Sequence, residues 1–291
     1  MTKLKKTTKI LIVGLGVIGG GYAAALTEAG YNVSAITKEA ADLDYALGHG
    51  IVKRGAAYPD PELISEAELI ISALYPTVFV EWVEEHCHLF REGAVITDVS
   101  GVKGAVVERV QSMLRDDLEF VPTHPMAGRE SSGVEFSDPS VFRGANYIIT
   151  PTEKNSREGL KLAAELGRVL GFDKVTELTP AEHDEIIAFI SQLTHVIAVS
   201  LMASRKTDGL ERYTGDSFRD LTRIAKINDR MWAELFNLNR EALLSEIDSF
   251  AETLSDFRSM LAEGDTDGMR MMMRMATKRR QAFDKPKPKN P

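Results

Sequence analysis

Among the residues that could do chemistry, His124 stands in the most favourable place. It follows Thr123 at the end of an apolar run, in the loop Thr123-His-Pro-Met-Ala-Gly-Arg-Glu130-Ser-Ser-Gly133. Histidine titrates near neutral pH and the following proline restricts the backbone, so His124 could exchange a proton with a substrate hydroxyl. Taken alone, a loop histidine can also be structural or simply exposed. The loop is therefore a candidate site that needs support from the rest of the chain.

A glycine-rich segment indicates a dinucleotide-binding site. It reads Gly14-Leu15-Gly16-Val17-Ile18-Gly19, directly after the apolar run Ile10–Val13 and at the start of a predicted helix. Gly14 allows a tight turn, Gly16 lets the backbone approach a pyrophosphate, and Gly19 lets helix and strand pack closely. The unpaired N–H groups at the start of the helix favour an anion. We predict that these six residues bind a nicotinamide dinucleotide.

The residues after the next predicted strand leave the form of the dinucleotide open. An acid at this place normally binds the ribose 2′-hydroxyl of NAD, but here Thr37 and Lys38 follow Ile36. Thr37 can bond either a hydroxyl or a phosphate. Lys38 could pair with a 2′-phosphate or be a solvated surface lysine. These residues therefore permit NADP without excluding NAD.

Composition narrows the function classes. The chain has 291 residues and a net charge of −8 at pH 7, which argues against a nucleic-acid partner because phosphates require a basic face. Cys87 is the only cysteine, and no spacing of Cys and His resembles a zinc site. We expect no apolar stretch to reach the ~20 residues that cross a bilayer. The expectation is a soluble, cytoplasmic protein without a metal, a nucleic-acid partner or a membrane partner.

The elements that must position these residues alternate between short apolar runs and amphipathic stretches up to about residue 178. This alternation predicts an α/β fold, a Rossmann-type doubly wound sheet. We expect helices at residues 76–89, 104–114 and 156–170. We expect strands at Ile10–Val13, Val33–Ile36, Leu69–Ala73, Val95–Asp98, Phe120–Thr123, Tyr147–Thr150 and Lys174–Leu178.

The second part of the chain is predicted to be all-helical. Thr179, Pro180 and Glu182 indicate a helix start, and long helical periodicity follows at residues 181–205, 218–225, 230–261 and 265–283. We place a nucleotide-binding domain at residues 1–178, a helical domain at 179–284 and a polar, Pro-rich tail or linker at 285–291. The apolar stripes of such helices favour burial against a second copy, so we expect a homodimer through the helical domain.

Several segments together resemble the prephenate dehydrogenase (TyrA) family. They are Gly14–Gly19, Asp98–Lys103, His124–Gly133, Leu178–Asp184, Ser191–His195, Phe218–Ala225 and Met231-Trp232. The resemblance implies the same Rossmann domain and a helical dimerisation domain, with no regulatory domain in this chain. It also implies oxidative decarboxylation of prephenate to 4-hydroxyphenylpyruvate in tyrosine biosynthesis, with NAD or NADP as cofactor and NAD slightly favoured.

The resemblance assigns roles to individual residues. His124 matches the catalytic histidine that would deprotonate the substrate hydroxyl as hydride departs, and His195 matches a second histidine that faces the substrate. Arg223 matches the arginine that holds a substrate carboxylate through a planar fork. Glu130 matches a gating acid near the pocket, and Trp232 matches a tryptophan that lines it.

Other residues were weighed for the same roles. Arg219 lies four residues before Arg223 on one helix face, and we interpret Arg219 as the surface ion-pairing residue. His183 and Asp184 lie at a helix start, and we interpret them as capping and domain-packing residues rather than catalytic ones.

The loop at Ser100 and Gly101 departs from the family pattern. The family usually has Asp-x-Gly-Ser-Val-Lys, with the serine touching the substrate and the catalytic histidine. Here the order is Asp98-Val-Ser-Gly-Val-Lys103. We predict a catalytic role for Ser100, which requires a rearranged loop, and a substrate contact at Gly101. Gln192 also stands where a histidine is common in the family.

Other functions on the same scaffold are alternatives to prephenate dehydrogenase. Arogenate dehydrogenase uses the same scaffold and accepts an amino group where prephenate carries a keto group. β-Hydroxyacid dehydrogenases and pyrroline-carboxylate reductases also join a Rossmann domain to a helical domain, but the motif around His124 argues against them. A dinucleotide-binding redox sensor would have no need of His124, His195 and Arg223 together.

Overall fold

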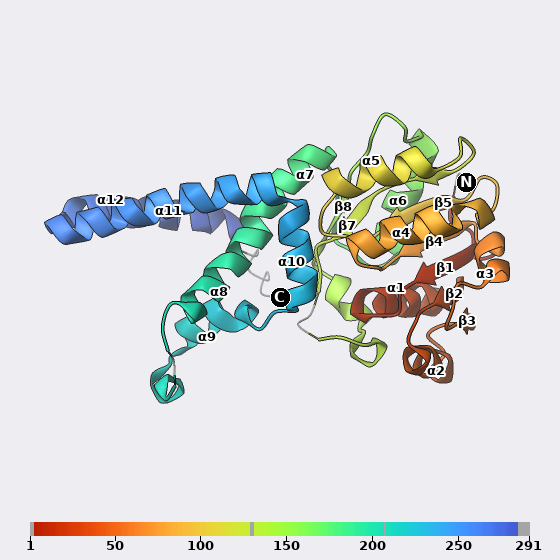
Figure 1. Cartoon of the computed structure of the whole chain (residues 1–291), viewed down its shortest axis with the longest axis horizontal. Coiled ribbons are helices and arrows are strands. Elements are labelled where there is room, and N and C mark those ends of the chain that lie inside the picture. The colour runs from red at the N-terminus through yellow and green to blue at the C-terminus, as the bar shows by residue number, and fades with distance from the viewer. Residues whose placement is uncertain (1–2, 129–130, 207, 285–291) are drawn as a thin grey trace, which may run out of the picture. The chain divides into compact units, whose positions relative to one another are not determined.

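The computed structural model describes residues 3–128, 131–206 and 208–284 of the chain (Figure 1). Its internal contacts divide the chain into two compact units, residues 1–242 and 243–291. The domain boundary predicted after Leu178 lies inside the first unit and stays a prediction. The predicted tail at 285–291 lies outside the described residues.

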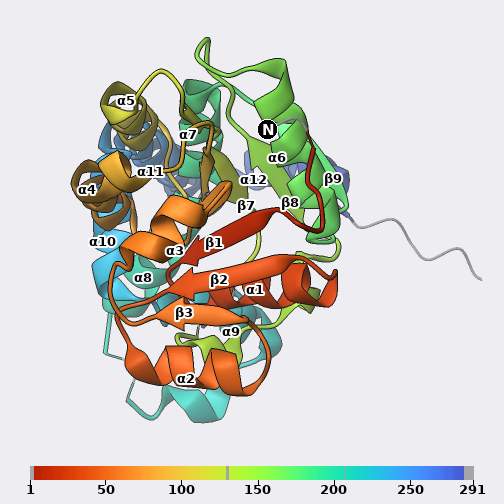
Figure 2. The same cartoon turned by 90° about the vertical axis from the view of Figure 1, so that its right-hand side faces the viewer.

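A six-stranded parallel sheet forms the centre of the first unit, in the order β3-β2-β1-β4-β5-β6. Figure 2 shows β1, β2 and β3 of this sheet side by side. The order reverses between β1 and β4, so the fold is doubly wound and the predicted Rossmann-type sheet is confirmed. Sequence reasoning missed β3, which has three residues and includes Arg54 and Gly55. The strands are β1 (Lys9–Val13), β2 (Asn32–Ile36), β3 (Arg54–Ala56), β4 (Leu69–Ser72), β5 (Val95–Asp98) and β6 (Glu119–Phe120).

Helices cover both faces of this sheet. They are α1 (Val17–Glu28), α2 (Ala40–Gly48), α3 (Pro61–Glu66), α4 (Pro76–His86), α5 (Gly104–Met113) and α6 (Arg157–Val169). Alternate side chains of β1 point to opposite faces of the sheet. Ile10 and Ile12 pack in a cluster with α1 and α6, whereas Leu11 and Val13 pack with α3, α4 and α5. Burial on both faces explains why the central strands β1 and β4 consist mainly of apolar residues.

A second, three-stranded sheet carries His124. Its strands are β7 (Thr123–Pro125), β8 (Asn146–Ile149) and β9 (Lys174–Glu177), with β7 antiparallel and β9 parallel to β8. The prediction of one strand at Phe120–Thr123 was wrong, because β6 and β7 belong to different sheets. The division occurs at Pro122, which has no N–H to continue a ladder. Val121 still donates to the Ile96 carbonyl at 2.9 Å, whereas the Pro122 carbonyl accepts from Thr150 at 3.0 Å.

Helices follow β9 in the first unit. They are α7 (Pro180–Ile187), the π-helix η4 (Ala188–Leu193), α8 (Thr194–Ala203), the 3-10 helix η5 (Leu210–Tyr213), α9 (Asp216–Thr222), the 3-10 helix η6 (Arg223–Ala225) and α10 (Asp229–Leu238). The predicted start at Thr179 is confirmed. The Thr179 hydroxyl accepts from the Glu182 N–H at 3.2 Å, and the Glu182 carboxylate accepts from the Thr179 N–H at 2.9 Å.

The predicted helix at residues 230–261 is divided at Asn239. Helix α10 ends at Leu238, and α11 (Arg240–Glu263) begins one residue later. The buried Asn239 amide donates to the Asp184 carbonyl and to Gln192 Oε1, both at 2.8 Å. Because these bonds come from residues about fifty positions away, the helical periodicity of the sequence could not reveal the break.

The second unit consists of the rest of α11 and of α12 (Thr266–Arg280). Gly264 joins them with a φ of 71°, and the Asp265 side chain caps α12 by accepting from Gly268 N–H at 2.9 Å. Large apolar side chains are exposed on both helices, including Leu254, Leu261 and Met271. This unit thus leaves apolar surface uncovered within the single chain.

The segment Pro180–Ala203, which joins α7, η4 and α8, is 24 residues long and apolar enough to cross a membrane by length and composition. The expectation that no apolar stretch reaches such a length was therefore wrong. Only 28% of its most apolar window is buried within the chain, and Phe189 and Ile190 are exposed. Length and composition alone are weak evidence for a membrane span, because the core helix of a soluble protein and a signal sequence meet the same criteria.

Candidate active site

The glycine loop between β1 and α1 has the form that a dinucleotide requires. Gly14 has a φ of 98°, and a Cβ atom there would lie 2.9 Å from the Ala73 carbonyl oxygen, so other residues would be strained. Gly16 is the N-cap of α1, and no atom lies within 4 Å of the place where its Cβ would be. A pyrophosphate can approach the backbone there and meet the N–H groups of the helix. The residues therefore fit a dinucleotide.

The remaining residues of the predicted loop support its shape. Leu15 and Val17 are buried and Ile18 is half-buried, so their side chains anchor the loop rather than line an open site. A Cβ atom at Gly19 would collide with the Gly14 carbonyl. This close approach is the reason for a third glycine.

Thr37 and Lys38 lie at the end of β2, as predicted, and differ in exposure. Thr37 is buried and donates its N–H to the Ala56 carbonyl at 3.1 Å. The Lys38 side chain is 85% exposed, and its ammonium lies 3.6 Å from Glu39. No acid occupies the position directly after the strand, so the choice between NAD and NADP rests on other contacts.

His124 lies in β7 next to the loop that follows β5. A Cβ atom at Gly101 of that loop would lie 3.6 Å from His124 Nε2. The opposite nitrogen, Nδ1, lies 2.9 Å from His183 Nε2 on α7. The ring of His124 is therefore held at one nitrogen, while the other faces the loop at the carboxyl end of the parallel sheet, where ligands bind in this class of fold.

Asp184 joins α7 to the start of α5. Its carboxylate accepts the N–H groups of Lys103 at 2.8 Å and Gly104 at 2.7 Å, and it lies 2.7 Å from His183 Nδ1. His183 is fully buried. A chain of hydrogen bonds thus runs from the first turn of α5 through Asp184 and His183 to His124.

A buried ion pair holds the loop after β5. Lys103 is fully buried, and its ammonium lies 2.7 and 2.9 Å from the two oxygens of Asp98 and 2.5 Å from the Thr123 carbonyl. Asp98 also accepts the Thr123 N–H at 3.0 Å. Burial lowers the pKa of Lys103, and the nearby Asp98 carboxylate opposes that shift. The pair ties the loop to the residue before His124.

Ser100 lies in this ion-paired cluster. It is buried, and its hydroxyl donates to the Asp98 carboxylate and lies 3.4 Å from the Lys103 ammonium. Among the described residues, the Ser100 hydroxyl bonds Asp98 and the Val102 carbonyl and makes no hydrogen bond to His124. Gly101 instead occupies the place beside His124 Nε2. The catalytic role predicted for Ser100 stays a prediction, and these contacts favour a role in holding the loop.

His195 and Trp232 form one stacked pair. Their rings lie 3.7 Å apart at 29°, with His195 on α8 and Trp232 on α10. His195 Nδ1 lies 2.9 Å from the Ser191 carbonyl and donates to it, which leaves Nε2 as the acceptor in the neutral ring. The two residues predicted to face the substrate are thus brought together.

The two arginines of the α9 region differ in their partners. Arg219 bonds the Thr214 carbonyl at 3.0 Å and Asp216 at 2.6 Å, the local pairing expected of a surface residue. Arg223 is exposed at the start of η6, which packs beside α8. Its predicted substrate contact stays a prediction. Glu130 lies outside the described residues.

The electrostatic surroundings keep the central histidines neutral. Burial lowers the pKa of His124 well below its usual value of 6.5, and His183 and Lys103 lower it further. Burial also lowers the pKa of His183, although its bond to Asp184 opposes the shift. At neutral pH both rings are uncharged, which suits His124 to accept a proton.

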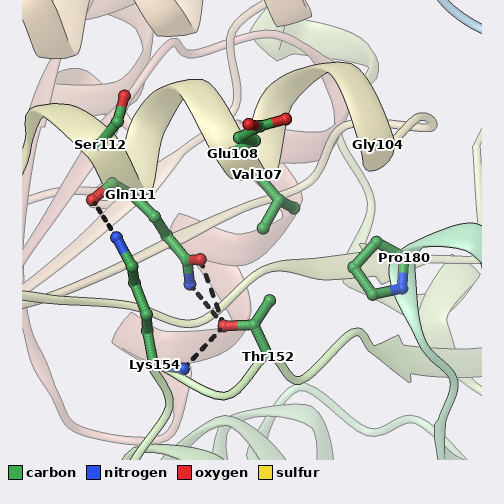
Figure 3. Close-up of a pocket in the computed structure, with 8 residues that line it drawn as sticks. All are labelled: Gly104, Val107, Glu108, Gln111, Ser112, Thr152, Lys154 and Pro180. Carbon is green, nitrogen blue, oxygen red and sulfur yellow. Dashed lines mark hydrogen bonds between the residues drawn. The ribbon is translucent and has the colours of Figure 1, made fainter.

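A separate groove lies along the outer side of α5, lined by residues that include Gln111, Thr152, Lys154 and Pro180 (Figure 3). Its polar groups bond one another, since Gln111 Nε2 lies 2.9 Å from Thr152 Oγ1 and Lys154 Nζ lies 3.2 Å from the Gln111 carbonyl. The predicted site residues do not line it. Within residues 3–128, 131–206 and 208–284, no cluster of His, Cys, Asp or Glu could hold a metal ion.

Comparison with known families decides the class of this site. Residues 22–172 match the family described as prephenate dehydrogenase, nucleotide-binding domain. Residues 179–275 match the family described as prephenate dehydrogenase, dimerization domain. The chain belongs to the prephenate dehydrogenase family.

Characterised relatives of this family align along most of the chain. A prephenate dehydrogenase of Bacillus subtilis is 29% identical over 278 residues, which cover 92% of this chain and 74% of that protein. A cyclohexadienyl dehydrogenase of Zymomonas mobilis is 26% identical over 271 residues, which cover 89% of this chain and 90% of that protein. A crystal structure of Aquifex aeolicus prephenate dehydrogenase with hydroxyphenyl propionate and NAD+ has a TM-score of 0.88 at 26% identity, covering 97% of this chain and 99% of that chain.

In this member of the prephenate dehydrogenase family, sequence reasoning interpreted His183 and Asp184 as capping and packing residues and did not foresee the contact between His183 and His124. Asp184 does cap α5, as an interpretation of capping and packing allows, but His183 also contacts His124 directly. A signal was available in the sequence, since a histidine and an acid stand side by side just after a helix start. Their approach to His124 across 59 residues could not be inferred from spacing.

Proposed function

We propose that this chain catalyses the oxidative decarboxylation of prephenate to 4-hydroxyphenylpyruvate with NAD or NADP. The observation that carries the proposal is the position of His124 Nε2. This nitrogen faces the loop at the carboxyl end of β5, in a chain whose β1 loop fits a dinucleotide. Family membership and the relatives of known activity support the same reaction.

In the proposed mechanism some residues bind the substrate and one residue, His124, transfers a proton. A dinucleotide held at the loop Gly14–Gly19 would supply the nicotinamide as acceptor for the hydride from C4 of the substrate ring. His124 Nε2 takes the proton of the C4 hydroxyl as its O–H bond breaks, and the hydroxyl becomes a carbonyl. Loss of the ring carboxylate as CO2 then leaves the aromatic product. Arg223 holds a substrate carboxylate, while His195 and Trp232 line the substrate side.

The ring chemistry is the same for arogenate, which makes arogenate dehydrogenase the second candidate. The cyclohexadienyl dehydrogenase among the relatives favours keeping it. The two substrates differ only in the side chain, an amino group in place of a keto group. Glu130, which the resemblance assigns as a gating acid near the pocket, lies outside the described residues.

We also propose that the enzyme is a cytoplasmic homodimer. The exposed apolar residues Ile186, Phe189 and Ile190 lie on α7 and η4, within the part of the chain that matches a dimerization domain. Burial of such a surface against a second copy removes apolar area from water.

The proposal is tested by following reduced nicotinamide by absorbance. The purified chain is mixed with prephenate or arogenate and with NAD or NADP, in all four combinations. We expect turnover with prephenate and at least one cofactor, and release of CO2 in equal amount. Turnover with arogenate alone would establish the second candidate, and no turnover in any combination would refute both.

A further inference from the structure

The bonding of Asp184 determines where protons lie in the chain of side chains that ends at His124. Both carboxylate oxygens accept backbone N–H groups, one from Lys103 at 2.8 Å and one from Gly104 at 2.7 Å. Backbone N–H groups can only donate, and the first turn of α5 favours a negative charge. Asp184 is therefore an acceptor on both oxygens.

The orientation of His183 follows from this. Its Nδ1 lies 2.7 Å from the same Asp184 oxygen that accepts from Lys103, so Nδ1 carries a proton and donates it. Burial keeps the His183 ring neutral at pH 7. A neutral imidazole has one N–H, so His183 Nε2 has a lone pair and accepts.

The same reasoning extends to His124. His183 Nε2 accepts, and it lies 2.9 Å from His124 Nδ1, so His124 carries its proton on Nδ1. The lone pair of the neutral ring is then on Nε2, the nitrogen that faces Gly101. This is the form of the ring that can accept a proton from a substrate in front of the loop.

We propose that His183 and Asp184 are positioning residues that fix the ring orientation and the tautomer of His124, so that Nε2 is the base. This inference rests on the proposed function for its kinetic consequences. Both ring nitrogens of the fully buried His183 are bonded, one to Asp184 and the other to His124. Because Gly101 offers no hydroxyl beside Nε2, orientation of His124 depends on the His183 side of the ring.

The pair also has a role after the proton has moved. When His124 takes the substrate proton on Nε2, its ring becomes positively charged. The Nδ1–H of His124 then donates to His183, whose own Nδ1–H donates to the Asp184 carboxylate. The Asp184 carboxylate keeps His183 in the form that accepts from His124, so the orientation of the His124 ring is held while Nε2 carries the proton.

The first test examines the free protein and does not depend on activity. Long-range nitrogen–proton correlation spectra of uniformly labelled protein distinguish the two tautomers of each imidazole. The chain has six histidines, and the signals are assigned with His124→Asn and His183→Asn. We expect both rings to carry the proton on Nδ1. A proton on Nε2 of His124 in the wild-type protein would refute the proposal, whatever the substrate is.

The second test compares two substitutions of His183. The amide of asparagine reaches the place of Nδ1 and can donate to Asp184, but it cannot reach His124. The amide of glutamine reaches the place of Nε2, where its oxygen can accept from His124. We expect His183→Asn to lower kcat by about 10²-fold with little change in either KM, since misplacement of a reacting group costs this much. His183→Gln should retain clearly more activity.

The pH dependence of kcat/KM gives a further measurement, which a purely structural role of His183 would leave unchanged. In the described part of the chain, two titratable groups face His124, namely His183 from α7 and Lys103 from the residue before α5. Asp98 bonds the Lys103 ammonium, and Asp184 bonds His183 and the Lys103 N–H. The apolar side chain of Leu235 from α10 lies near the Gly101 loop. His183 helps to lower the pKa of His124. Its replacement by asparagine should therefore raise that pKa, so the fall of kcat/KM on the acid side should begin at higher pH.

The matched control is His86→Gln. His86 is also buried, and its Nδ1 lies 2.9 Å from the Trp82 carbonyl, far from the site in sequence and on α4. We expect a loss of stability without a change in kcat or in the pH profile. Equal losses in His183→Asn and His183→Gln, or an unshifted acid limb in both, would overturn the proposal. Absence of turnover in the wild-type protein would instead refute the proposed function and leave the spectra to decide the tautomer.

Discussion

At this site, proton transfer and substrate binding are expected from two different residues, His124 and Arg223. His124 faces the loop after β5 with a nitrogen that no described side chain bonds, whereas Arg223 is exposed on η6 in the helical part of the first unit. The first residue is placed to move a proton, and the second is of the type that pairs with a carboxylate. Substitutions at the two positions should therefore alter different kinetic constants.

We expect His124→Asn to lower kcat by at least about 10²-fold while cofactor binding is unchanged, because an amide cannot take the proton. Arg223→Ala should mainly raise the KM for prephenate, because a planar fork for its carboxylate is lost. Initial-rate kinetics with a cofactor titration measure both. Near-normal turnover of His124→Asn would contradict the role of the base, and an unchanged KM would place the carboxylate elsewhere.

The choice between NAD and NADP can also be tested at a single residue, Thr37 at the end of β2. No acid follows β2 directly, and Thr37 is buried with a bond to Ala56. An aspartate at position 37 would accept from the ribose hydroxyls and repel a 2′-phosphate. We expect Thr37→Asp to raise the ratio of kcat/KM for NAD to that for NADP. A ratio that does not change, measured beside the exposed control Glu39→Gln, would show that this position does not read the ribose.

At the scale of elements, α7 has a central place because it begins beside β9 and carries His183 and Asp184. Its start is defined by the capping box of Thr179 and Glu182. Asp184 in turn satisfies two N–H groups at the start of α5. One helix thus supplies both the end of the bond chain to His124 and a cap for a neighbouring helix, so the start of α7 should affect stability.

Thr179→Ala removes the hydroxyl that accepts from the Glu182 N–H. We expect the free energy of unfolding to fall by about 1 kcal/mol, the usual cost of losing such a cap. Urea denaturation followed by circular dichroism measures it. Ser112→Ala, an exposed hydroxyl that only bonds the Arg109 carbonyl within α5, serves as the control and should change little. An equal effect in both variants would contradict the importance of the cap.

At the scale of the whole molecule, exposed apolar surface gathers in the helical segments. In the first unit it includes Phe189 and Ile190, and in the second unit Leu254 and Met271. Isolated apolar residues on a surface are ordinary, but several on long helices indicate a partner. The match of residues 179–275 to a dimerization domain agrees with a second copy as that partner.

We expect the wild-type chain to sediment as a dimer and Phe189→Glu to shift it toward monomer, because a charge would be buried in the interface. Sedimentation velocity over a range of concentrations measures the shift. Phe136→Glu is the control, since Phe136 is 51% exposed and Phe189 54% exposed, but Phe136 lies on the 3-10 helix η2 (Val134–Phe136), outside residues 179–275 that match the dimerization domain. A dimer that tolerates Phe189→Glu, or a monomeric wild type, would contradict the proposal.

The sequence by itself determined the class of fold, and it predicted the places where ligands would bind. Local patterns are enough for this, because a strand, a glycine loop and a helix start each depend on residues close together in the chain. The runs that became β1, β2, β4 and β5, the loop at Gly14–Gly19 and the cap at Thr179 were predicted within a residue or two. His124 was singled out for the same reason, as a titratable residue at the end of a strand.

Only the tertiary structure decided how these parts contact one another. Pro122 divides two sheets because its neighbours bond different strands, and Asn239 divides two helices because it bonds Gln192 and Asp184. His183 contacts His124 across 59 residues of sequence. The bonds at both of its ring nitrogens are the basis for proposing His124 Nε2 as the base. Such contacts depend on packing between distant segments, and the periodicity and spacing of a single sequence carry no record of them.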